Sequence, residues 1–171
     1  MLNDLIKDRI KKLEKYRESK NPYPARVSRE FSIKEVLEKH SELEKSEDSI
    51  SIAGRVMAWR DMGKIIFADI NDGTGRIQLV LKEEEVKDLE LLQETVDMGD
   101  IIESSGTAFT TKKNEKSILS NSIDIITKSL RPIPSGFYGL EDKEIRLRKR
   151  YLDLVLNEDV KDIFVKKNIF W

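Results

Sequence analysis

The sequence contains no cysteine, and its 171 residues include a single histidine, His40. Without cysteine the chain has no disulfide framework, no thiol nucleophile and no thiolate ligand for a metal ion. A single histidine also excludes a His-rich metal site. His40 lies near the end of a short predicted helix, where we expect it on the surface. Thiol chemistry and histidine-rich metal chemistry are therefore excluded as the basis of function.

Long apolar runs are also missing, because no stretch approaches the roughly 20 residues that a membrane span needs. The N-terminal segment MLNDLIKDRIKKL carries too many charges for a signal peptide. Lysine and arginine total 31 against 32 aspartate and glutamate residues, so the net charge of −1 favours no class of partner. Hydrophobic residues make up 39% of the chain, enough for a modest core. We expect a soluble cytoplasmic protein without membrane association, with one ordinary domain and flanking elements.

The clearest pattern that the sequence does contain is a β-hairpin, IIFADINDGTGRIQLVL, from Ile65 to Leu81. Apolar residues recur at every second position in both halves, which places them on one face of each strand. These residues are Ile66, Ala68, Ile70, Ile77, Leu79 and Leu81. Between the halves, Asn71-Asp72-Gly73-Thr74-Gly75 supplies residues that tolerate positive φ. The segment is therefore predicted to form two strands joined by a tight turn.

The opposite faces of this hairpin carry side chains suited to reading a single-stranded nucleic acid. They are Phe67 and Asp69 on the first strand, and Arg76, Gln78 and Val80 on the second. A phenyl ring stacks on any base, and an amide and a guanidinium hydrogen-bond to base edges. The same alternation also fits a structure in which Phe67 is a half-buried strand residue covered by a neighbouring loop.

The hairpin belongs to a longer β pattern over residues 49–127. One strand precedes it from Ile50, residues 83–96 have helical spacing, and two more strands are expected at 101–110 and 117–127. Three strands, a helix and two strands is the connectivity of the OB-fold, a five-stranded barrel that binds oligonucleotides across strands 2 and 3. Phe67 and Gln78 would then be exposed on that face. A barrel that binds an oligosaccharide or a protein is the alternative.

Helices are predicted on both sides of the barrel. Leu2 to Tyr16 has an apolar side and a basic side, which is either a solvated face or a surface for a phosphate backbone. Ser32-Ile33-Lys34-Glu35 is a capping box that opens a short helix through about His40, before a charged loop over residues 41–48. After the barrel, linker helices are expected at about residues 142–156 and from a cap at Glu158-Asp159 onward.

Two Pro-x-Pro stretches, Pro22-Tyr23-Pro24 and Pro132-Ile133-Pro134, bracket the barrel and mark its boundaries. We expect an N-terminal helical extension at residues 1–48, the OB-fold at 49–128, and a linker with the start of a truncated domain at 129–171. No stop signal follows the last helix, so the chain is expected to end inside it.

The segment after the barrel, SLRPIPSGFYGLEDKEIRLRKRYLDLVLNEDV, resembles the join between the anticodon-binding and catalytic domains of class II lysyl-tRNA synthetases. The similar residues are Leu130-Arg131-Pro132, Pro134, Gly139-Leu140, Asp142, Glu144, Arg146 and the RYLDL run at 150–154. RIKKLEKYRESKNPYP is similar to the N-terminal helix of that family. Gly54-Arg55, Met62-Gly63-Lys64, Phe67 and Gly75-Arg76-Ile77-Gln78-Leu79 are similar to its barrel. The resemblance covers essentially the whole chain.

The resemblance implies that the barrel reads the anticodon of lysine tRNA, whose central base is uridine. Phe67 would stack on that base, and Gln78 and Arg60 would hydrogen-bond to its edge or hold it in place. Glu115 would contact the third anticodon base. Arg76 joins them as an RNA-binding candidate from its place on the strand face. Without the resemblance, Arg60 and Glu115 would be interpreted as ordinary loop charges.

The family joins lysine to tRNA through a lysyl-adenylate, with ATP and magnesium, and is dimeric mainly through its catalytic domain. Its signature motifs follow RYLDL, so the resemblance implies a fragment that binds RNA, has no catalytic or metal-binding residue and uses no cofactor of its own. A free-standing OB-fold RNA-binding or scaffold module is the alternative. The basic run RLRKR, residues 146–150, either packs at the hinge with the catalytic domain, contacts phosphates or is a transport signal.

Overall fold

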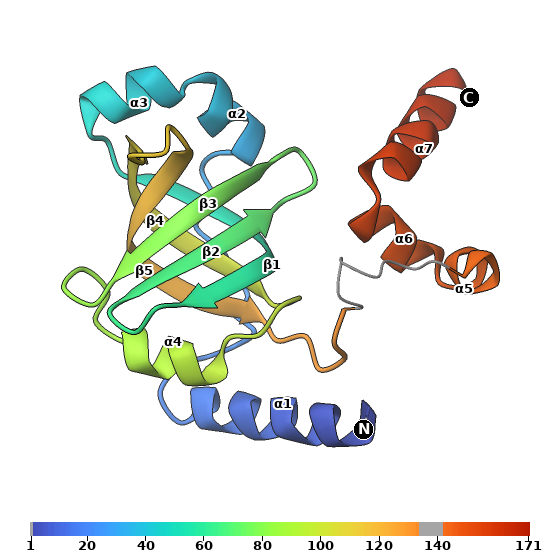
Figure 1. The fold of residues 1–171 in the computed structure, drawn as a ribbon, viewed down its shortest axis with the longest axis horizontal. Coiled ribbons are helices and arrows are strands. Elements are labelled where there is room, and N and C mark those ends of the chain that lie inside the picture. Colours follow the sequence, from blue (N-terminus) through green and yellow to red (C-terminus); the bar gives the residue numbers. More distant parts are fainter. Residues whose placement is uncertain (1, 134–141) are drawn as a thin grey trace. The chain divides into compact units, whose positions relative to one another are not determined.

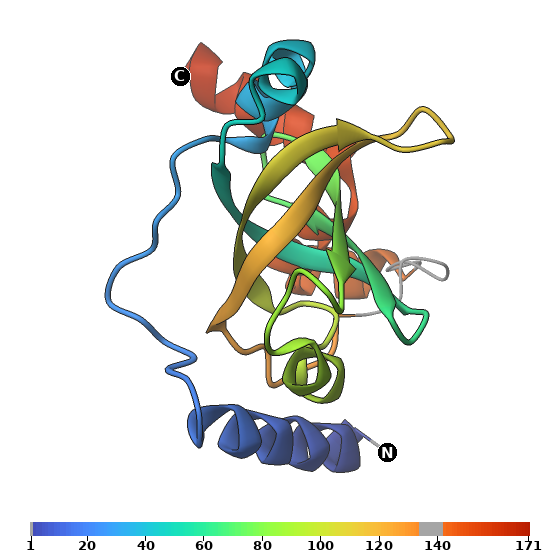
Figure 2. The same cartoon turned by 90° about the vertical axis from the view of Figure 1, so that its left-hand side faces the viewer.

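The computed structural model describes residues 2–133 and 142–171, and the contacts divide the chain into two compact units. Unit Met1–Pro132 holds a closed barrel with helices at both of its ends (Figure 1, Figure 2). The described part of unit Ile133–Trp171 is helical. The predicted finer boundary between residues 48 and 49 stays a prediction. Pro134, Gly139 and Leu140, which contribute to the family resemblance, lie outside the described residues.

The barrel has the predicted OB-fold connectivity. Its elements are β1 (Ile50–Asp61), β2 (Ile65–Asn71), β3 (Arg76–Lys82), α4 (Leu89–Thr95), β4 (Ile101–Thr110) and β5 (Lys116–Thr127). The strands close in the order β1-β2-β3-β5-β4, with β3 and β5 parallel and the other neighbours antiparallel. Helix α4 is shorter than the predicted segment 83–96, because the buried Val86 lies in a turn and only imitates helical spacing.

The alternating aliphatic residues of β2 and β3 fill the barrel, as the hairpin pattern predicted. The six side chains of this pattern, three on β2 and three on β3, are each between 0% and 3% exposed. Burying each isoleucine or leucine among them stabilises the fold by about 1.5–3 kcal/mol. A slip of register by one residue would turn the whole set outward, so burial specifies the pairing of the two strands strongly.

Strands β4 and β5 approach each other too closely at Gly106 for any side chain. A Cβ atom at Gly106 would lie 2.0 Å from the carbonyl oxygen of Leu119, where the register of the two strands shifts. Nearby, the Ser104 hydroxyl donates to Ser120 Oγ at 2.8 Å in the interior. This bond satisfies two buried polar groups, so the polar sequence of β4 is compatible with a closed barrel.

Helix α1 (Leu2–Arg17) packs against α4 at one end of the barrel (Figure 1). Tyr16 anchors it there, 1% exposed. Its hydroxyl donates to Asp124 Oδ1 at 3.2 Å and accepts from the backbone N–H of Ile125 at 2.9 Å. Burial raises the pKa of Tyr16 to about 12. On the predicted apolar side Leu13 and Tyr16 therefore form the packing face, whereas Leu2, Leu5 and Ile10 are exposed.

The basic side of α1 is partly neutralised within the protein. Lys12 pairs with Asp97 at 2.8 Å, and Lys15 pairs with Glu94. Lysines that already face carboxylates of their own chain are weak phosphate ligands, because RNA would have to displace those partners. We therefore do not place the RNA-binding surface on α1.

Helices α2 (Ile33–Glu38) and α3 (His40–Ser46) lie at the opposite end of the barrel from α1 (Figure 1, Figure 2). The predicted capping box is present, since Ser32 Oγ accepts from Glu35 N and the Glu35 carboxylate accepts from Ser32 N at 2.8 Å. The loop predicted over residues 41–48 is wrong, because α3 occupies most of it.

Packing against β4 explains why this charged segment is helical. Glu44 accepts hydrogen bonds from the backbone N–H of Thr110 at 2.6 Å and from its hydroxyl at 3.0 Å. The predicted surface position of His40 is also wrong, because His40 is 1% exposed. Its Nδ1 lies 3.9 Å from Glu44 Oε2, one helical turn away.

The second unit consists, in its described part, of α5 (Lys143–Arg148), α6 (Arg150–Leu156) and α7 (Glu158–Phe170). The single helix predicted over about residues 142–156 is wrong, because it breaks at Lys149. The buried Asp153 accepts from Arg150 at 2.5 Å and from Asn157 at 2.6 Å. The predicted cap at Glu158-Asp159 is also wrong, since Asn157 holds the N-cap position without a side-chain capping bond.

The close approach at Gly106 predicts a strong effect of the smallest side chain. Gly106→Ala should lower the free energy of unfolding by at least about 3 kcal/mol, because the new methyl group meets backbone rather than a movable side chain. Urea unfolding of both proteins measures the difference. Gly63→Ala is the matched control: Gly63 has φ +80° but open space around its Cβ position, so strain alone costs about 1–2 kcal/mol. Equal losses would contradict the steric argument.

Candidate nucleic-acid interface

The outer face of β2 and β3 carries most of the residues that the sequence analysis selected. Alternation commits every second residue of the hairpin to the interior, so the intervening ones face outward. Across the two strands Phe67 pairs with Val80, and Asp69 pairs with Gln78. Phe67 and Gln78 therefore lie on the same side of the barrel wall, two register positions apart along the strands.

Phe67 is half-buried and outside the core. In the described part of the chain, the partly buried side chains packed against the core are Phe31, Leu37, Leu43, Trp59 and Leu91, and Phe67 is not one of them. Its cross-strand neighbours are Arg60 on β1 and Val80 on β3. The ring therefore stands on the outer wall with part of its surface accessible.

Gln78 differs from the prediction, because it is 7% exposed rather than open to solvent. Asp69 and Val80 on the same face are also buried. Strand β3 has neighbours on both sides, and α2 and the start of β5, distant in sequence, contribute side chains to the wall around its outer end. The Ser117 hydroxyl donates to Gln78 Oε1 at 3.3 Å, which leaves the amide nitrogen as a donor for a ligand.

A hollow of about 360 Å³ opens beside Gln78. Its lining consists of Leu37, Asp69, Arg76, Ile77, Gln78, Glu115 and Lys116. It thus brings together three of the five predicted site residues, from β3 and from the turn between β4 and β5. Phe67 and Arg60 do not line it and stand beside it on the neighbouring strands.

Two guanidiniums converge on the carboxylate of Asp69. Arg76 Nη2 lies 2.7 Å from Asp69 Oδ2, and Arg60 Nη2 lies 3.4 Å from Asp69 Oδ1. Asp69 is in the middle strand of the three and its side chain is 11% exposed, whereas the side chains of Arg60 and Arg76 are 48% and 55% exposed. Each arginine keeps further N–H groups beyond the one that it donates to Asp69.

The turn between β4 and β5 holds Glu115 at the rim of the hollow. Asn114 has φ 62°, a left-handed backbone conformation that asparagine tolerates. The backbone N–H of Thr111 donates to the Glu115 carbonyl at 3.0 Å and closes the turn. Lys116 Nζ donates to the Leu37 carbonyl at 2.8 Å, which ties this turn to the C-terminal end of α2.

Asp72 ties the other end of α2 to the hairpin. Its Oδ2 accepts from Ile33 N at 3.0 Å, and its Oδ1 accepts from Thr74 N at 2.8 Å and Gly75 N at 3.2 Å. Burial alone would raise the pKa of Asp72, but the hydrogen bonds from Thr74, Ile33 and Gly75 outweigh it and lower the pKa below its ordinary value. Helix α2 is thus fixed at both ends beside the hollow.

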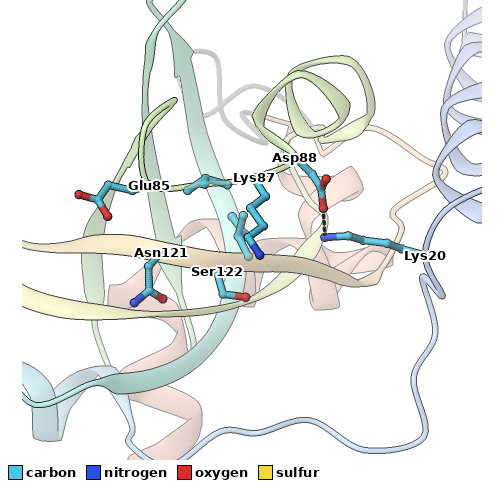
Figure 3. A pocket seen from close by; sticks show the side chains of 8 residues that line it. Lys20, Glu85, Lys87, Asp88, Asn121 and Ser122 are labelled. Carbon is cyan, nitrogen blue, oxygen red and sulfur yellow. Dashed lines mark ion pairs between the residues drawn. The ribbon is translucent and has the colours of Figure 1, made fainter.

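A second hollow, of about 280 Å³, lies elsewhere on the barrel between Lys20, the segment before α4 and the middle of β5 (Figure 3). Its lining holds two lysines, Lys20 and Lys87, and two acids, Glu85 and Asp88. Lys20 already pairs with Asp88 at 2.9 Å. With opposite charges balanced and one lysine engaged, this hollow selects no class of ligand.

Other kinds of site are not found among the described residues. No group of three or more histidine, cysteine, aspartate or glutamate residues there is arranged to hold a metal ion. Within the same part of the chain, no helix combines the length and the apolar character that a membrane span requires.

Comparison with known proteins shows what the chain is similar to. Residues 50–126, which span the barrel, match the family described as OB-fold nucleic acid binding domain. The chain is 41% identical over 168 residues to a lysine–tRNA ligase of Clostridium botulinum, covering 96% of this chain and 33% of the relative.

The chain is similar over nearly its whole length to the N-terminal third of lysine–tRNA ligases.

Two further lysine–tRNA ligases, of Carboxydothermus hydrogenoformans and Clostridium acetobutylicum, are 39% and 38% identical and cover 98% and 97% of this chain. The chain spans about a third of the length of these relatives, at 34% and 32%. The resemblance to lysyl-tRNA synthetases and the OB-fold prediction are therefore confirmed. The assignment of single residues to RNA contacts stays a prediction.

The hollow in this chain is also surrounded by residues to which the sequence analysis gave no role. Asp69 was visible on the outer face, but nothing in the sequence indicated its two arginine partners. Leu37 and Lys116 reach the hollow from α2 and β5 through tertiary contacts, and Ser117 on β5 contacts Gln78. A short-range pattern carries no signal for such contacts.

The contacts of Asp72 predict how acid affects the fold. Its folded pKa is lowered, so the stability that its carboxylate gives is present above the unfolded value near 3.8 and is lost as the pH falls through the folded pKa. Asp72→Asn should lower the free energy of unfolding by about 1–3 kcal/mol at pH 7, and by less in acid. Urea unfolding of the two proteins at several pH values, from pH 7 to below 3.8, measures the loss at neutral pH and its decrease in acid.

The control for this experiment is Asp8→Asn, since the Asp8 side chain is 60% exposed on α1 and faces Lys12 at 3.7 Å. Exposed pairs of this kind contribute about 0–1 kcal/mol. An Asp72→Asn deficit that stayed constant from neutral pH into acid would contradict the role given to the carboxylate.

Proposed function

We propose that the outer face of β2 and β3 binds the anticodon loop of lysine tRNA, as part of a lysine–tRNA ligase. One observation carries the proposal: a partly accessible ring, Phe67, stands beside a hollow that contains an oriented amide, Gln78, on strands 2 and 3 of an OB barrel. OB-folds bind oligonucleotides across these strands. The lysine–tRNA ligase names of the relatives support the choice of tRNA.

In this proposal the central uridine of the anticodon stacks on Phe67. The Gln78 amide nitrogen, left free by the Ser117 contact to Oε1, donates to O4 of uracil. Cytosine presents an amino donor where uracil presents its O4 acceptor, so the same amide would reject it. Arg60, opposite Phe67 on β1, holds the base or its phosphate through its remaining N–H groups.

The third anticodon base is assigned to the turn between β4 and β5. The Glu115 carboxylate at the rim of the hollow accepts hydrogen bonds from base N–H groups, and Arg76 donates from the opposite wall. Lys112 and Lys113 are exposed in the same turn and supply positive charge for the neighbouring phosphates. The hollow would thus receive bases while its rim receives the backbone.

We further propose that the parent enzyme joins lysine to this tRNA in the cytoplasm, with ATP and magnesium, and acts as a homodimer. The support is the family's reaction and the alignment of this chain with about a third of each relative. In the family pattern the catalytic motifs follow RYLDL, and the role that we propose for this chain is RNA binding.

The stacking role predicts the effect of removing the ring. Phe67→Ala should weaken binding of a lysine-anticodon stem-loop by about 1–3 kcal/mol, roughly 5- to 150-fold in Kd, because base–aromatic stacking contributes that much. Fluorescence anisotropy at fixed salt concentration measures both affinities.

The control is Tyr23→Ala, an exposed aromatic in the segment after α1 whose ring faces the Arg17 guanidinium. It should bind the stem-loop as the unchanged protein does. An unaltered Kd for Phe67→Ala would remove the ring from the site, and a lack of preference for the lysine stem-loop over one with a different central base would remove the proposed function.

A further inference from the structure

Asp69 is the acidic side chain between the two arginines of the recognition face. Each of its two carboxylate oxygens binds a different arginine: Oδ2 accepts from Arg76 at 2.7 Å, and Oδ1 accepts from Arg60 at 3.4 Å. Each arginine lies diagonally across from Asp69 on a neighbouring strand, within reach of a long side chain. Asp69 also pairs directly with Gln78 and lines the same hollow.

This arrangement restrains two side chains that would otherwise move freely. Arg60 and Arg76 are about half exposed, and an unpaired arginine of that exposure loses much rotamer freedom when it binds a ligand. With one N–H group of each already donated to Asp69, both guanidiniums are oriented before RNA arrives. Most of the side-chain entropy that the two arginines lose on being ordered is then lost when the protein folds, and not when RNA binds.

The same carboxylate reduces the charge of the face. Two guanidiniums and one carboxylate leave a single net positive charge at the junction of β1, β2 and β3. Because sequence-independent RNA binding grows with the number of phosphates that a protein neutralises, Asp69 lowers that component. It therefore affects oriented recognition and generic attraction in opposite directions.

We infer that Asp69 is a positioning residue for specificity: it aligns Arg60 and Arg76 with the Gln78 hollow and suppresses binding of RNA that has no matching base to place there. The inference rests on the proposed function of this face. A purely structural role for Asp69 would affect all RNA ligands alike, whereas this role affects matching and non-matching RNA differently.

The test uses the whole chain with two stem-loops, the lysine anticodon and the same RNA with cytidine at the central position. Asp69→Asn keeps the shape of the side chain and removes its charge. It should weaken binding of the first RNA about tenfold, from the freedom returned to two arginines. Binding of the second RNA should be unchanged or tighter, with a steeper dependence on salt.

Two further variants complete the design. Asp69→Glu keeps the charge and should retain most of the preference for the lysine stem-loop. Glu90→Gln removes one negative charge from an exposed position on α4, remote from the site, and should change both affinities equally. Circular dichroism and urea unfolding verify that each variant is folded.

Equal weakening of both RNAs by Asp69→Asn, or a preference that it leaves intact, would overturn the positioning role while the proposed function stands. If the unchanged protein binds both stem-loops equally, the proposed function fails as well. A loss of preference in Asp69→Asn that Asp69→Glu restores supports the inference.

Discussion

The alternation of side chains in a closed barrel is the constraint on which the recognition face depends. The interior requires Ile66, Ala68 and Ile70, all fully buried, so Phe67 and Asp69 between them face outward. The β3 strand obeys the same rule in register with β2. Closure of the barrel fixes the register of the strands, because a closed barrel has no free edge along which a strand could slip. Ring, carboxylate and amide thus keep one arrangement for as long as the core is filled.

Contacts between segments that are distant in sequence convert this exposed strand surface into a shaped site. Asp72 joins the hairpin turn to the start of α2, and Lys116 joins β5 to its end. Between these two contacts, Leu37 becomes one wall of the hollow. The polar groups inside it are restrained by partners rather than by burial alone, which suits a site that must present donors and acceptors in fixed directions.

Short-range patterns predicted the barrel well, because hairpin alternation, turn residues and the capping box at Ser32 are local signals. They failed where tertiary contacts decide the structure. The charged segment 41–48 is mostly helix because Glu44 bonds to β4, and His40 is buried by the same packing. Gln78 is covered by elements far along the chain. At the site, the residue types were predictable from the sequence, but the Asp69 ion pairs and the Ser117 contact were not.

The central claim is that RNA meets the outer wall of β2 and β3. Amide chemical-shift mapping of the isotope-labelled chain during titration with a lysine-anticodon stem-loop tests it most directly. The account predicts that the largest shifts fall on β2, β3 and the turn between β4 and β5, around Phe67, Gln78 and Glu115. Shifts confined to α1 or to the hollow beside Lys20, with the β2–β3 face unchanged, would contradict it.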